Sequence, residues 1–200
     1  MSFNTFGQNS KSVGALRQVW AEVTGVKSGG GTLSGFEELP VGAVIPAGTP
    51  VYLDRAGGAL IAIHTFEVGV AAIAAATQYI VNGDVIPQVN SFVMKAGSGA
   101  AVKINSIIVN ADGTIQLTLA ATLGALAVGD ILVESGAAGA SGAVLATPNG
   151  LLWHDIVKEE GDTLATGAVV DRGRIYEDRI NPIPASFKAV LPSIKFEKGI

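Results

Sequence analysis

The densest group of ionisable side chains in this sequence lies in NGLLWHDIVKEEGD, residues 149–162. His154 stands directly before Asp155, and three further carboxylate residues follow by position 162. Histidine and carboxylate side chains are the usual groups of acid–base catalysis and metal binding. The stretch therefore has two interpretations: a catalytic or metal-binding centre, or a polar strand and turn.

The spacing of the histidines argues against a metal centre. Neither His64 nor His154 has a partner two to four positions later that is placed to chelate a metal with it on one element. Adjacent side chains of a strand point to opposite faces, so His154 and Asp155 could not easily share a metal in a strand. We expect both histidines to be half-buried at strand edges, and we expect no metal, cofactor or catalytic site.

Other enzyme and nucleotide-binding motifs are missing from the sequence. It contains no Gly-x-Ser-x-Gly pattern, and Ser98 and Ser141 lie between small residues that favour turns. The stretch Lys27–Thr32, KSGGGT, shares glycines with phosphate loops but lacks their spacing. It is more typical of a linker.

Composition excludes several classes of protein. Of the 200 residues, 48% are hydrophobic and 15% charged, which is too apolar for a disordered chain. There are no cysteines, and a net charge of −4 argues against a broad nucleic-acid surface. The longest apolar run, residues 68–76, is half the length of a membrane helix, and the N-terminus lacks a signal-peptide pattern. We expect a soluble chain made in a cytoplasm, with no membrane, nucleic-acid or small-molecule partner.

Residues 1–35 differ from the rest. The apolar positions of residues 12–23 favour a short helix, although a strand is also possible, and the glycines of residues 25–31 predict a flexible break. We interpret residues 1–35 as an arm that binds a partner. The alternative is an ordinary first element followed by a loop.

From Phe36 onward the pattern is mainly β. Short apolar runs alternate with Gly, Pro, Asn and Asp, and residues 59–68, ALIAIHTFEV, have the pattern of one strand. Asp112-Gly113 predicts a hairpin turn within residues 103–120. We expect a compact body resembling a β-barrel or β-sandwich over residues 36–180.

The C-terminal segment, residues 181–200, contains apolar residues punctuated by Pro182, Pro184 and Pro192. There is room for a turn or two of helix between Pro184 and Pro192, and the rest should be extended. An apolar tail of this kind is expected to pack on the body or on a neighbouring subunit.

Two stretches resemble the small head decoration proteins of tailed bacteriophages, and the related phage head fibre proteins. They are VIPAGTPVYLDRAGGAL, residues 44–60, and NGLLWHDIVKEEGDTLATGAVVDRGRIYEDRINPIP, residues 149–184. The stretch between them, about residues 70–148, is longer than in the smallest members of that family.

The resemblance implies a β-rich fold of the β-tulip type and a homotrimer on the outer surface of a capsid. The partner would be the major capsid protein, and the location would be the exterior of a virion assembled in the host cytoplasm. The N-terminal arm would contact the capsid, with Phe3, Phe6, Arg17 and Trp20 as candidate contacts. We expect the subunit interface to use His64, Phe66, Tyr176, Ile183, Phe187 and Leu191.

Two other functions compete with a non-enzymatic decoration protein. One is another phage structural β protein, such as a tail tube or a tail-fibre segment. The other is a small hydrolase or carbohydrate-binding module that uses His154 and Asp155. Aromatic residues make up 6% of the chain, which is low for a row of sugar-stacking rings.

Overall fold

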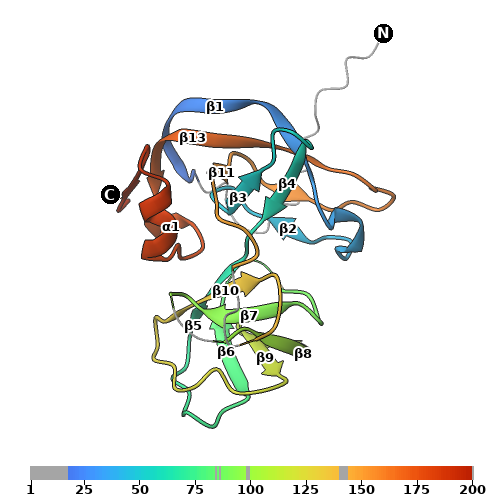
Figure 1. Cartoon of the computed structure of the whole chain (residues 1–200), viewed down its shortest axis with the longest axis vertical. Helices are drawn as coiled ribbons and strands as arrows, with labels where there is room; N and C mark the ends of the chain where they lie inside the picture. Colours follow the sequence, from blue (N-terminus) through green and yellow to red (C-terminus); the bar gives the residue numbers. More distant parts are fainter. Residues whose placement is uncertain (1–17, 84, 86, 98–99, 140–143, 200) are drawn as a thin grey trace.

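The structure of the chain, a computed structural model, describes residues 18–83, 85, 87–97, 100–139 and 144–199. The chain is mainly β, as expected, and the described residues form two β units, one above the other in Figure 1. The second unit, between strands β4 and β11 in the sequence, is an insertion into the first.

The elements of the first unit come from both ends of the chain. They are β1 (Trp20–Leu33), η1 (Phe36–Glu38), β2 (Val44–Ile45), β3 (Pro50–Leu53), β4 (Ala59–Ala62), β11 (Gly150–Leu152), β12 (Ile156–Val157), β13 (Thr166–Tyr176), η2 (Glu177–Arg179), α1 (Ala185–Val190) and β14 (Ile194–Glu197).

Strand pairing in the first unit closes on itself. The order runs β1-β4-β3-β11-β13, and β13 pairs in turn with β1, while β14 adds to β13 in parallel. Strands β2 and β12 form a separate antiparallel pair. The core of this unit includes Val51, Leu60 and Val169, which their strands direct inward, and Phe36, which η1 adds.

Strand β1 corrects the expectation of a helix followed by a flexible break. From Trp20 to Leu33 the chain is one strand, in which Gly25 and Gly31 pair with β13 while Gly29 and Gly30 lie at an irregularity of the ladder. The physical reason is close approach: a Cβ at Gly31 would lie 2.5 Å from Leu53 Cδ1 and 3.0 Å from Leu60 Cβ, so a side chain there would have to displace these core residues. The predicted arm of residues 1–35 thus belongs to the body from Trp20 onward.

The inserted unit is a closed barrel with the strand order β10-β5-β6-β9-β8-β7. Its strands are β5 (Thr65–Val68), β6 (Gln78–Asn82), β7 (Phe92–Lys95), β8 (Val102–Val109), β9 (Ile115–Leu119) and β10 (Ile131–Ser135). The predicted hairpin is confirmed: β8 and β9 pair through Val109 and Ile115, and Gly113 takes a φ of 85° in the turn.

The apolar run of residues 59–68, expected to form one strand, is divided between the two units. Residues up to Ala62 belong to β4, and those from Thr65 belong to β5 in the barrel. The division is fixed by different partners, because β4 pairs with β3 and β5 pairs with β10. Ile63 and His64 form the crossing between the units.

The two units pack together through a shared apolar cluster. Strand β10 turns Leu132 into the barrel and Val133 outward, against Leu151 and Ile175 of the first unit. This alternation gives β10 two buried faces, which explains why both neighbouring residues are fully covered. The barrel is therefore held against the first unit by packing as well as by the chain.

The C-terminal segment packs on the body of its own chain. The expected short helix is α1, and Phe187 on this helix lies in the shared cluster with Ile183 and Leu191. Arg174 donates two hydrogen bonds of 2.8 Å to the Glu197 carboxylate, which fastens β14 to β13. No helix in the described part of the chain is long and apolar enough to cross a membrane.

Gly150 offers a test of the close approach between β11 and β13. An added Cβ would lie 2.3 Å from Val169 Cγ1 and 2.7 Å from the Val170 carbonyl oxygen. We predict that Gly150→Ala lowers the free energy of unfolding by about 1–3 kcal/mol, measured by denaturant unfolding, because overpacking forces the backbone apart.

Gly136→Ala is the matched control, since its Cβ would meet nothing nearer than 3.9 Å. Equal stability of the Gly150→Ala variant and the wild type would contradict the close packing of β11 against β13.

Candidate functional site

His154 and Asp155 lie in the bend between β11 and β12, which corrects the expectation that they occupy a strand. The chain must turn there because β11 pairs with β3 and β13, whereas β12 pairs with β2. The His154 ring is exposed and stacks on the neighbouring Trp153 ring, with centroids 4.6 Å apart and planes 19° apart. This ring is therefore an exposed stacked group, whereas a half-buried position was expected.

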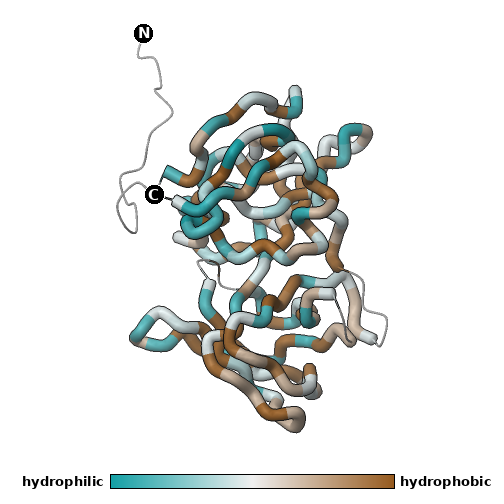
Figure 2. The backbone as a smooth tube through the Cα atoms, turned by 90° about the vertical axis from the view of Figure 1, so that its left-hand side faces the viewer, coloured by the Kyte–Doolittle hydropathy of each residue, from teal (hydrophilic) through white to brown (hydrophobic). Residues whose placement is uncertain are grey.

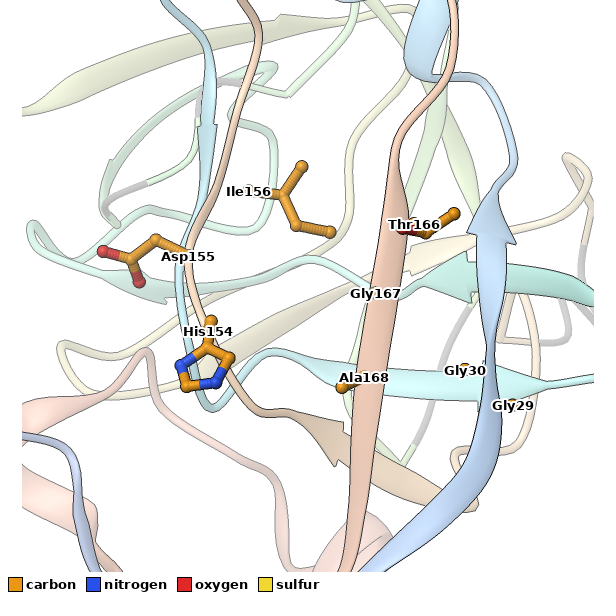
Figure 3. A pocket seen from close by; sticks show the side chains of 8 residues that line it. All are labelled: Gly29, Gly30, His154, Asp155, Ile156, Thr166, Gly167 and Ala168. Carbon is orange, nitrogen blue, oxygen red and sulfur yellow. The ribbon is translucent and has the colours of Figure 1, made fainter. Parts of the chain in front are cut away.

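Asp155 has a structural partner. Its Oδ1 atom accepts a hydrogen bond of 2.7 Å from the backbone N–H of Ala47, a residue remote in sequence. The carboxylate thereby ties the bend after β11 to the turn before β3. In Figure 3, the Asp155 and His154 side chains point in different directions, so they do not converge on a common point.

The polar segment after this bend contains one buried charge. Lys158 is only 6% exposed, its ammonium donates to the Asp162 carbonyl oxygen, and it lies 4.5 Å from the centre of the Phe36 ring. Glu159, Glu160 and Asp162 are exposed, as expected for a solvated turn. The lysine secures the turn to the core by a hydrogen bond and a cation–π contact.

The glycines of KSGGGT form a bulge in β1. Lys27 pairs with Val169 and Gly31 with Gly167, so three residues of β1 stand opposite the single residue Ala168 of β13. Gly29 and Gly30 take φ values of 92° and 55°, which side-chain-bearing residues rarely adopt. The expected linker is therefore an ordered irregularity of the sheet.

Two shallow grooves flank this bulge. One, of about 360 Å³, is drawn in Figure 3, and the other is about 410 Å³. The first is lined by Gly29, Gly30, His154, Asp155, Ile156, Thr166, Gly167 and Ala168. The second is lined by Ser28, Gly29, Gly30, Leu53, Arg55 and Gly58.

The chemistry available in these grooves is limited. Near the second groove, burial and then the Arg55 charge lower the pKa of Lys27, and Asp171 opposes the shift. Within the described ranges, no group of three His, Cys, Asp or Glu residues could hold a metal ion. The grooves contain polar groups, but the described side chains do not pair a nucleophile with a base.

The predicted capsid contacts fall mostly outside the described residues. Phe3, Phe6 and Arg17 belong to residues 1–17, which the structure does not describe. Trp20 begins β1, and its Nε1–H donates a hydrogen bond of 2.9 Å to the Trp153 carbonyl oxygen. Its indole is therefore engaged within the body, which makes it a poor candidate for a free arm contact.

Most of the predicted subunit-interface residues are core residues of a single chain. Phe66 is 0% exposed inside the barrel, and Ile183, Phe187 and Leu191 are buried in the cluster shared by the two units. Their burial is complete without a second subunit. The apolar tail therefore covers its own body, and these four side chains offer no surface to a neighbour.

His64 and Tyr176 keep part of their surface. His64 Nδ1 lies 3.0 Å from Glu134 Oε2 at the crossing between the units, while its Nε2 atom is buried without a hydrogen-bond partner. The Tyr176 ring lies under the Arg179 guanidinium, 4.4 Å from its carbon. No sequence pattern indicates the contact between His64 and Glu134, because seventy positions separate the two residues.

An exposed apolar surface at the end of the barrel was also missed. Val70, Ile73 and Val128 are all more than half exposed. The sequence signal for this surface is the run of residues 68–76, which is apolar and carries no charge although it is too short for a membrane helix.

Comparison of the chain with family models, curated proteins and solved structures gives no match. The site must therefore be interpreted from its own geometry.

The two residues of the bend should behave differently when truncated. We predict that Asp155→Ala lowers the free energy of unfolding by about 1–2 kcal/mol, because the N–H of the buried residue Ala47 loses its charged hydrogen-bond acceptor. His154→Ala should change it by less than about 0.5 kcal/mol, as is usual for an exposed side chain. Thermal or denaturant unfolding measures both.

Asp155→Asn is the control, since its amide oxygen can still accept the Ala47 N–H. A larger destabilisation by His154→Ala than by Asp155→Ala would contradict the structural role assigned to Asp155.

Proposed function

We propose that this chain is a structural virion protein that decorates the outer surface of a phage capsid as a homotrimer, in the manner of head decoration or head fibre proteins. The observation that carries the proposal is the position of the two stretches that resemble that family. Residues 44–60 and 149–184 are far apart in the sequence, yet they lie together in the first unit.

The two stretches are joined by strand pairing and by side-chain hydrogen bonds. Gly150 pairs with Val51, and Leu151 with Pro50. The Asn149 side chain accepts a hydrogen bond from the Leu53 N–H and donates one to the Leu53 carbonyl oxygen, both of 3.0 Å. An amide that satisfies both peptide groups of one residue continues the sheet as a strand neighbour would. The two resembling stretches thus form one structural unit.

The inserted barrel supports the same proposal by accounting for the length of the intervening stretch. The described residues between Thr65 and Ser135 form a barrel with its own core. The first unit is therefore the part to compare with a β-tulip decoration fold, and the barrel is an addition to it.

The function proposed is mechanical. A trimer would present three N-terminal segments to neighbouring copies of the major capsid protein. Weak individual contacts suffice, because binding of one segment raises the effective concentration of the other two. The proposed location is the capsid exterior, after assembly in the host cytoplasm, with no role for a cofactor or a small-molecule substrate.

The N-terminal segment gives the direct test. Removal of residues 2–17 is expected to abolish co-sedimentation with capsids of the encoding phage that lack this protein. The body should stay folded because β1 begins only at Trp20. Co-sedimentation measures binding, and far-UV circular dichroism and the melting temperature check the fold.

A full-length variant with Phe3 and Phe6 changed to Ser separates the loss of the apolar contacts from the change in chain length. This variant should bind the capsids more weakly than the wild type does. Full binding by the truncated protein would remove the segment from the mechanism. Failure of the intact protein to bind these capsids would overturn the proposed function.

A further inference from the structure

The end of the barrel farthest from the first unit is an exposed apolar surface without charge. Two loops form it, residues 70–77 and 120–128, which we call the apolar tip. Ile73 is 76% exposed, Val128 64% and Val70 52%, and the surrounding exposed residues are mostly alanines. The loop between β5 and β6 lies at the bottom of Figure 1, and Figure 2 shows mainly tan and brown there.

The two loops are fastened to each other. Ala72 and Leu126 form an isolated bridge, with N–H to O=C hydrogen bonds of 2.9 and 3.0 Å in the two directions. The Thr122 hydroxyl donates to the Ala74 carbonyl oxygen over 2.6 Å. The exposed side chains are therefore presented by backbone that is hydrogen-bonded across the tip.

The buried Tyr79 hydroxyl fixes the same loops from beneath. It donates a hydrogen bond of 2.6 Å to the Ala76 carbonyl oxygen and accepts one of 2.8 Å from the Leu123 N–H. One hydroxyl thus joins residues from both loops. A preorganised apolar surface loses little conformational entropy on binding, which favours a role in association.

Charge is confined to the edge of the tip. Asp130, two residues beyond Val128, forms a 2.7 Å ion pair with Lys95 and accepts a 2.8 Å hydrogen bond from the Ala127 N–H. These contacts hold the pKa of Asp130 below its usual value, with the Lys95 hydrogen bond as the largest cause. The carboxylate therefore anchors the loop and is already neutralised by its partner.

We propose that the apolar tip is the surface through which copies of this chain associate, so that its occupant is the tip of a second copy. This inference rests on the proposed homotrimer and assigns its subunit contact.

Charge favours this occupant. Side chains close to a symmetry axis meet their own copies, so a charge there would be repeated and would repel those copies. The loops 70–77 and 120–128 contain no charged residue in a chain whose net charge is −4.

The size of the surface predicts a weak contact. A standard interface uses about 20–30 residues from each partner. The two loops contain 17 residues, so the association is expected to depend on protein concentration. The residues expected from the sequence to form the interface are mostly buried within one chain, so an exposed surface is needed in their place.

The test is the oligomeric state of the full chain, measured by sedimentation velocity from low to high micromolar concentration. The wild type is expected to sediment as a trimer. The double variant Ile73→Asp, Val128→Asp should weaken association about 100-fold or more, because it buries unpaired charges of one sign at the contact. Val70→Lys is a second variant that introduces the opposite charge, and it should also weaken association.

Leu164→Asp is the matched control. Leu164 is 72% exposed but belongs to the first unit, so this variant should associate like the wild type. Circular dichroism and melting temperature establish that each variant is folded. A monomeric wild type, unchanged association of the folded tip variants, or equal dissociation by Leu164→Asp would each overturn the inference.

Capsid binding is measured separately and distinguishes this inference from the proposed function. A wild type that forms trimers through the tip but binds no capsid would support the inference and overturn the decoration role. A trimer that binds capsids and is indifferent to the tip substitutions would support the decoration role and overturn the inference.

Discussion

The antiparallel pairing of β1 with β13 closes the strand circuit of the first unit, and it depends on glycine at the points of closest contact. A Cβ at Gly173 would lie 2.5 Å from the Glu22 carbonyl oxygen, and one at Gly167 would lie 2.5 Å from Leu60 Cδ2. Side chains at these positions would push β13 away from β1 or from the core beneath it. Because β13 also pairs with β11 and β14, its position fixes the N-terminal strand, the segment before His154 and the C-terminal strand together.

The fixed position of β13 also explains why the polar stretch of residues 149–162 has a structural role. β11 and β12 lie in different sheets, so the bend that carries His154 and Asp155 must be held from outside the sheet. Asp155 bonds to the Ala47 backbone, and Lys158 bonds to the Asp162 carbonyl oxygen over the Phe36 ring. These ionisable groups stabilise a turn between sheets, and their side chains are directed to separate partners.

Local patterns in the sequence predicted local structure well. Asp112-Gly113 specified a hairpin, and the prolines around residues 185–190 left room for the helix found there. Contacts between remote residues could not be predicted in this way. Gly29 and Gly30 have the composition of a linker, and only the proximity of β13 makes them a bulge. The run of residues 59–68 likewise has one pattern, yet its two halves find partners in different units.

The place where the inserted barrel joins the first unit has an evolutionary consequence. The Glu134 N–H donates to the His64 carbonyl oxygen over 3.0 Å, and the Glu134 carbonyl accepts from the Leu145 N–H over 3.0 Å. The chain segments that enter and leave the inserted barrel are thus both hydrogen-bonded to Glu134, so the two ends of the insertion lie close together. A unit whose ends meet can be gained, lost or exchanged during evolution while the strand circuit that hosts it keeps its pairing. The first unit can then keep its structure while the inserted barrel changes in sequence.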